Sequence, residues 1–224
     1  MPHGSAVPPR PQPLAHTCSL TPPSRPVSQV RWDHIALFVR VVPPDAPKEM
    51  ADSTAGELAL LEATGPSGVQ IIPWVEFVTN EWHDLYSRMA LRRVAFERRP
   101  DCIAAFESFV NSELGKPYSL SLSKLSKRAS AASKAPRAAA EGGRSYAEEA
   151  SYFCSELVAQ ALMTLRVLPV DRSSVVFWPG DFGSQSPPLR LNEGCSMGDE
   201  QLIDFHTFGR APPRKIIPYR ELNI

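Results

Sequence analysis

The chain of 224 residues, 43% of them hydrophobic, can bury one good core and is too short for two full-sized domains. Lys plus Arg (24 residues) balance Asp plus Glu (24 residues), so the formal net charge is zero. This excludes attraction of nucleic acid or of an anionic membrane by the net charge of the molecule. No apolar run approaches the roughly 18 residues needed to cross a bilayer, and the N-terminus lacks an apolar signal-peptide core. We therefore expect a soluble, cytoplasmic protein without a nucleic-acid partner.

Residues 1–29 are expected to form a disordered extension. They are rich in proline, contain no acidic residue and show neither a helical nor a strand period. The lack of acid also resembles a transit peptide, but the prolines would break the amphipathic helix that such peptides form. Organelle targeting is thus the less favoured alternative, and residues 30–224 are expected to form the single folded domain.

The first part of this domain has the pattern of strands. Residues 34–39 are a short apolar, β-favouring run that ends before a pair of prolines. Residues 58–63 and 69–75 are further apolar segments, and the Gly-Pro-Ser-Gly run at 65–68 between them is typical of a turn. Neighbouring strands joined by short turns predict an antiparallel sheet.

The pattern then changes to that of helices. Residues 81–114 have three-and-four spacing, with Ile103, Phe106 and Val110 on one face, and Gly-Lys-Pro at 115–117 predicts the end of the helix. A second helix is expected to begin near Cys154.

Residues 119–148, between these helices, are expected to be a flexible insertion. The segment is rich in serine and alanine, carries local positive charge and ends near a Gly-Gly pair. It is therefore expected to interrupt the folded domain.

The chain contains four cysteines, which are Cys18, Cys102, Cys154 and Cys195. They form no CxxC pair and no Cys/His spacing of the kind that binds zinc, so we expect free thiols and no metal site. The reaction considered below needs no organic cofactor either.

Cys154 is the best candidate for a nucleophile, because it lies where a helix is expected to begin. A thiol attacks as its thiolate, and a helix N-terminus lowers the pKa of a thiol through its dipole and its unpaired N–H groups. The same N–H groups can bind the oxyanion that develops when a carbonyl is attacked. The alternative is that Cys154 is a small apolar side chain of the core.

His34 and Glu62 are the candidates for its partners. A nucleophilic cysteine needs a base, usually an imidazole oriented by a third polar group. His34 opens the first predicted strand, and strand alternation places Glu62 on the face opposite Leu61 and Ala63. Facing side chains of antiparallel neighbours come within reach of each other, so Glu62 would meet His34. The alternatives are a histidine at a strand edge and a glutamate that faces solvent.

Four blocks of the chain, in order, resemble those of the permuted papain-like amidases, the YaeF/YiiX group: DHIALFV at 33–39, LLEATGPSGV at 60–69, LGKPY at 114–118 and FCSELV at 153–158. This group is akin to NlpC-type peptidases and to lecithin retinol acyltransferase-like enzymes, in which the histidine strand precedes the cysteine helix. The resemblance covers about residues 30–190. The segment between His34 and Glu62 and the insertion at 119–148 are longer than in the group.

The resemblance implies an α+β, circularly permuted papain-like (NlpC-like) fold, with a small antiparallel sheet packed on the cysteine helix. It makes Cys154 the nucleophile, His34 the general base and then acid, and Glu62 the residue that orients the imidazole. The implied activity is that of a thiol hydrolase or acyltransferase, which attacks an ester or amide carbonyl and forms an acyl-enzyme.

The substrate class that we favour is a lipid acyl ester or amide. Kinship with the acyltransferase-like enzymes supports it, as does the basic insertion, which would make peripheral contact with anionic lipid through Lys124, Lys127, Arg128, Lys134 and Arg137. A cysteine peptidase or amidase that cleaves a peptide link is the alternative enzyme. A catalytically idle binding module with the same fold is the third alternative. The expected partner is thus a small-molecule, lipid or peptide substrate.

Overall fold

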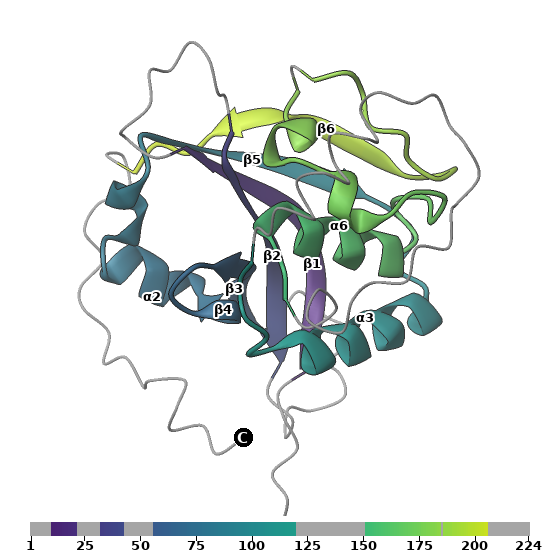
Figure 1. Ribbon diagram of the computed structural model, residues 1–224, viewed down its shortest axis with the longest axis horizontal. Coiled ribbons are helices and arrows are strands. Elements are labelled where there is room, and N and C mark those ends of the chain that lie inside the picture. The colour runs from purple at the N-terminus through teal and green to yellow at the C-terminus, as the bar shows by residue number, and fades with distance from the viewer. Residues whose placement is uncertain (1–9, 22–31, 43–55, 120–150, 185, 206–224) are drawn as a thin grey trace, which may run out of the picture.

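Figure 1 shows the computed structural model of the protein, which describes residues 10–21, 32–42, 56–119, 151–184 and 186–205. Residues 10–21 are described by their backbone. Apart from Ser119, the insertion predicted at 119–148 lies outside the described residues. Within the described ranges, no helix has both the length and the apolar composition that crossing a bilayer requires.

The fold is α+β and is built on a single antiparallel sheet. Its strand order is β4-β3-β2-β1-β5-β6. The strands are β1 (Arg10–Thr21), β2 (His34–Val42), β3 (Glu57–Thr64), β4 (Gly68–Pro73), β5 (Arg88–Ala95) and β6 (Ser196–Leu202).

The strands predicted from residues 34–73 are confirmed. β2 pairs with β3 so that Leu37 faces Leu61, and β3 pairs with β4 across the turn at 65–67. β2 and β3 carry nearly continuous apolar runs whose successive side chains point to opposite faces, so their pairing buries apolar surface on both faces of the sheet. The predicted third strand ends at Pro73, and the helix α2 (Trp74–Thr79) continues from it.

The prediction that residues 1–29 are disordered is wrong for residues 10–21. These residues form β1, which pairs with β2 on one side and with β5 on the other. The prolines of this segment argued against a central strand because proline cannot donate to the ladder. The ladder with β2 changes register between Pro13 and His16, so the pairing accommodates the prolines by an irregularity.

The prediction of a continuous helical segment at 81–114 is also wrong in part. The 3₁₀ helix η1 (Trp82–Leu85) and the strand β5 come first, and only α3 (Pro100–Glu113) is an α-helix. β5 is formed by pairing with β1 and β6, whose residues are distant in sequence. α3 buries Phe106 and Val110 and ends before the predicted stop at 115–117.

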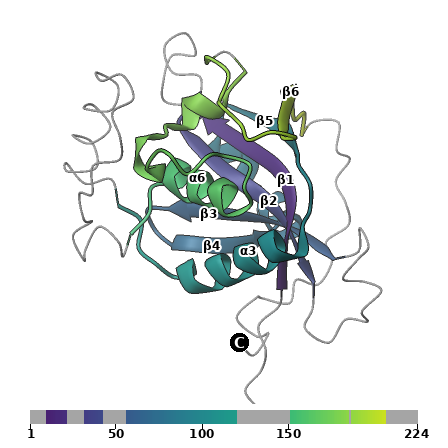
Figure 2. The ribbon, with the colours of Figure 1, turned by 90° about the vertical axis from the view of Figure 1, so that its right-hand side faces the viewer.

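The two faces of the sheet are covered by different helices. α3 and α6 (Cys154–Thr164) lie over one face, as Figure 2 shows. There Leu157, Val158 and Leu162 of α6 pack in one cluster with apolar residues of β2 and β3. On the other face, Phe77 of α2 packs with Phe38 and with Leu60. β2 and β3 are therefore buried on both sides, which holds the strands under α6 in place.

Gly68, at the start of β4, is required by the turn that joins β3 to β4. Its φ is +69°, and a Cβ there would overlap the carbonyl oxygen of Lys116. The backbone beside it forms two hydrogen bonds, Val69 N–H to Lys116 O at 2.8 Å and Gly115 N–H to Val69 O at 2.9 Å. The segment that follows α3 is therefore fastened to β4 at this point.

We expect Gly68→Ala to lower the free energy of unfolding by about 2–3 kcal/mol, because it combines an unfavourable left-handed φ with a backbone overlap. Urea unfolding followed by circular dichroism measures this. Gly65→Ala is the matched control, since a Cβ at Gly65 meets nothing within 4 Å. Equal unfolding midpoints for the two variants would contradict the prediction.

Candidate active site

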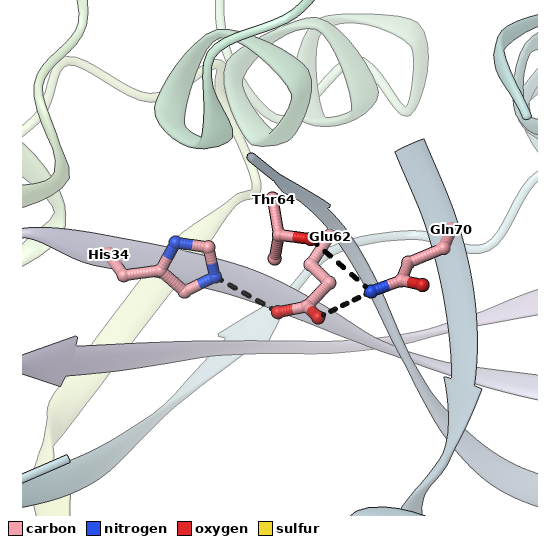
Figure 3. A network of polar contacts seen from close by, with 4 residues as sticks. All are labelled: His34, Glu62, Thr64 and Gln70. Atoms are coloured by element: carbon pink, nitrogen blue, oxygen red, sulfur yellow. Dashed lines mark hydrogen bonds and ion pairs between the residues drawn. The ribbon is translucent and has the colours of Figure 1, made fainter. Parts of the chain in front are cut away.

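His34 and Glu62 meet on the two adjacent strands that the sequence predicted. His34 is the first residue of β2, and Glu62 lies in β3, near the end that pairs with the start of β2. The Nε2 atom of His34 lies 3.0 Å from Oε2 of Glu62, as Figure 3 shows. The predicted contact between these side chains is confirmed.

The carboxylate of Glu62 is buried, with 4% of its side chain exposed. Leu61 and Ala63 lie on the opposite face of β3 within the core, as the alternation predicted. The other carboxylate oxygen, Oε1, accepts a hydrogen bond from the side-chain amide of Gln70 at 3.1 Å. Glu62 therefore has a partner at each oxygen, as a buried carboxylate needs.

Gln70 is the residue of this network that sequence reasoning missed. It lies directly opposite Glu62 in the β3–β4 register. The amide also lies 3.5 Å from the hydroxyl of Thr64. A signal was present in the sequence, because a turn at 65–67 pairs residue 62 with residue 70 and puts both side chains on one face.

Cys154 is the first residue of α6, as predicted. The preceding residue, Phe153, is extended, and its N–H group donates to the carboxylate of Glu156 at 3.4 Å. The hydroxyl of Ser155 donates to the carbonyl of Phe177 at 2.6 Å, which fastens this end of the helix to the following segment. These bonds fix where α6 begins and hence where the sulfur lies.

The first turn of α6 has N–H groups available for a ligand. The first bond within the helix runs from Leu157 N–H to the carbonyl of Phe153 at 3.0 Å. The N–H groups of Cys154 and Ser155 precede it and have no acceptor within the helix. Such groups can donate to an anion, so an oxyanion formed at the sulfur would meet donors there.

His34 interacts with Cys154 as well as with Glu62. Burial lowers the pKa of the imidazole, but hydrogen bonding and charge interactions with Cys154 and Glu62 outweigh it and raise the pKa of His34 to about 10. Since Nε2 faces Glu62, Nδ1 is the ring nitrogen left for the sulfur. At neutral pH the imidazole thus holds its proton beside the carboxylate of Glu62 and the sulfur of Cys154.

The raised pKa also links this site to the stability of the fold. The pKa of His34 rises from 6.5 to about 10 on folding. The site therefore contributes stability that is fully present below about pH 6.5 and is lost as the pH rises through about 10.

The candidate site is nearly closed to solvent. Cys154 is fully buried, while 14% of the His34 side chain is exposed. The ring of Tyr86 lies nearly parallel to the imidazole, with a centroid distance of 6.2 Å. A substrate would reach the sulfur only after side chains over it move.

The described residues also form a pocket of about 360 Å³, which is lined by residues of the segments 169–181 and 187–190 that follow α6 in the chain. Its lining includes Phe177 but none of Cys154, His34 and Glu62. Phe177, which lines the pocket, accepts a hydrogen bond from Ser155 at the start of α6 through its carbonyl.

The remaining thiols have different surroundings. Cys102 is buried in α3, and Cys195 is half-buried, with its pKa raised by burial. Cys18 lies in β1. Among the side chains that the structure describes, no group of three or more His, Cys, Asp and Glu residues is placed to bind a metal ion.

A scan of the sequence against models of known protein families finds no match. A search of curated proteins finds no significant match either.

Proposed function

We propose that the protein is a thiol hydrolase or acyltransferase that uses Cys154, His34 and Glu62 as a catalytic triad. The observation that carries the proposal is the imidazole of His34, which interacts with Cys154 and is held by Glu62 at 3.0 Å. A base between a helix-terminal thiol and a buried carboxylate is the arrangement that activates nucleophilic cysteines. We also propose the permuted papain-like fold, because the histidine strand precedes the cysteine helix in the chain.

In the proposed reaction, the thiolate of Cys154 attacks a carbonyl carbon and forms a carbon–sulfur bond. The carbonyl electrons move to the oxygen, which accepts hydrogen bonds from N–H groups of the first turn of α6. The bond to the leaving alcohol or amine then breaks, and the leaving group takes the proton from Nδ1 of His34. A thioester of Cys154 remains.

When the acyl group is released, His34 acts as a base instead of an acid. Nδ1 of His34 takes a proton from a water molecule, whose oxygen attacks the thioester carbonyl. The carbon–sulfur bond breaks, and Cys154 leaves as a thiolate beside the imidazolium. An acceptor alcohol or amine in place of water would make the reaction an acyl transfer.

An apolar acyl group is the substrate feature that the surroundings of Cys154 support. The ring of Phe153 contacts Tyr118 at a centroid distance of 5.6 Å and Trp178 at 6.3 Å. Trp178 is 41% exposed, so an apolar aromatic surface leads from solvent toward the residue before Cys154. We therefore favour a lipid acyl ester or amide over a peptide link.

The idle binding module remains the second candidate, and the full burial of Cys154 is the observation that favours it. A module of this kind would keep the histidine–glutamate contact only for stability. The proposal and this alternative differ in whether the sulfur reacts.

Thiol labelling tests the proposal. At pH 6 we expect iodoacetamide to label Cys154 faster than Cys18, Cys102 and Cys195, because the imidazolium of His34 favours a thiolate at Cys154. Peptide mapping measures the order, and His34→Ala should remove the advantage. If Cys18 or Cys195 labels first while Cys154 stays inert, the proposal is wrong.

A panel of chromogenic substrates then separates the substrate classes. We expect turnover of p-nitrophenyl octanoate to exceed that of p-nitrophenyl acetate and of peptide p-nitroanilides. The reverse order would favour the peptidase, and a labelled Cys154 without any turnover would favour the idle module.

A further inference from the structure

Glu62 is held by Gln70 at the oxygen that does not face His34. Oε2 lies 3.0 Å from the imidazole, and Oε1 accepts a hydrogen bond from the Gln70 amide at 3.1 Å. Only 4% of the Glu62 side chain is exposed, so bulk water has little access to replace the amide. The direction of the carboxylate therefore depends on both neighbours.

The chemistry of this contact fixes the orientation of the Gln70 side chain. A carboxylate accepts hydrogen bonds, so the amide must present its NH₂ group to Oε1 and keep its oxygen away. The NH₂ group also lies 3.5 Å from the hydroxyl oxygen of Thr64. Figure 3 shows Glu62 between the imidazole on one side and the Gln70 amide on the other.

The backbone places Gln70 firmly. It lies opposite Glu62 in the β3–β4 ladder, where facing side chains share one face of the sheet. The next residue toward the turn, Val69, is hydrogen-bonded through both its N–H and its carbonyl to the segment 115–116. The amide thus projects from a strand that is paired on both sides at this point.

We propose that Gln70 is a positioning residue, whose amide keeps the Glu62 carboxylate directed at Nε2 of His34, so that Nδ1 of the imidazole stays turned to Cys154. This proposal rests on the proposed function of the triad. A hydrogen bond from a donor to a buried carboxylate is charge-assisted, and its loss leaves Oε1 without a partner. The carboxylate is then free to turn, and a turned carboxylate holds the imidazole less well.

Two variants of nearly the same size test the role of the donor. Gln70→Leu removes the hydrogen bond, and Gln70→Glu replaces the donor by a second carboxylate beside Glu62. We expect each to lower kcat/KM on an acyl ester about 10-fold to 100-fold at pH 8, mainly through kcat. As the pH falls, kcat/KM of Gln70→Glu should rise relative to that of Gln70→Leu. The introduced carboxyl group is then protonated and can again donate a hydrogen bond to Glu62.

Gln201→Glu is the matched control, since Gln201 is an exposed glutamine of the edge strand β6. It should leave both the rate and the pH profile unchanged. Unchanged kinetics in both Gln70 variants would overturn the proposal. A loss of kcat/KM that is the same in Gln70→Leu and Gln70→Glu at every pH would also overturn it, because that is the result a merely structural role predicts.

An NMR titration of His34 separates failure of this proposal from failure of the proposed function. The imidazole carbon signals report the proton on His34 whether or not the protein turns over a substrate. We expect Gln70→Leu to make His34 lose its proton at lower pH than in the wild type, because Glu62 then holds the imidazolium less well. An unchanged titration would overturn the role of Gln70, whereas a shifted titration in a protein without activity would refute only the catalytic function.

Discussion

Cys154→Ala is expected to lower kcat/KM on an acyl ester by about 10⁴-fold or more, because in the proposed reaction it removes the atom that bonds to the substrate. His34→Ala should have a similar effect, since the imidazole holds the positive charge that favours the thiolate and gives the proton to the leaving group. Steady-state kinetics on purified variants measure both. Removing both side chains together should cost little more than removing either, because the two groups act as a unit.

The control for this experiment is Cys195→Ala, which removes a half-buried thiol far from His34 in the chain and should leave the rate unchanged. The fold should survive Cys154→Ala, because alanine fills most of the volume of a buried cysteine at the start of α6. A Cys154→Ala variant that keeps more than about a tenth of the activity would exclude the thioester mechanism.

Glu62→Gln is expected to change the pH dependence as well as the rate. The carboxylate is one of the groups that raise the pKa of His34 to about 10, so an amide in its place should lower that pKa. In the wild type, activity should fall as the pH rises through about 10 and His34 loses its proton. In Glu62→Gln this loss should occur at lower pH.

The expected loss of kcat/KM at the optimum is about 10-fold to 100-fold, smaller than for Cys154 or His34, because Glu62 orients the base without taking its proton. A profile of kcat/KM against pH and the thiolate absorbance near 240 nm measure the two effects. An alkaline limb that stays at the wild-type pH would show that Glu62 does not act on the charge of His34.

The local features of this protein were open to prediction from the sequence. The runs that became β2, β3 and β4 are apolar and β-favouring and are bounded by proline or turn residues, and the start of α6 near Cys154 follows from the helical spacing of the apolar residues after it. The contact of His34 with Glu62 was predictable on another ground, because facing side chains of neighbouring antiparallel strands come within reach of each other. The strands and the helix start follow from residues that are close in sequence, whereas the His34–Glu62 contact joins residues 28 apart.

What the sequence could not determine depends on contacts between distant segments. β1 comes from the proline-rich start of the chain, and in the sheet it lies between β2 and β5. No local pattern of residues indicates that such a segment pairs with a strand as distant in sequence as β5. The burial of Cys154 likewise depends on how α6 packs against the sheet. The sequence by itself thus determined β2, β3, β4 and the start of α6, because those follow from local backbone preferences and apolar runs bounded by turn residues. Only the tertiary structure decided the order of the strands in the sheet and the burial of the Cys154 sulfur, because hydrogen bonding and packing between distant segments set both.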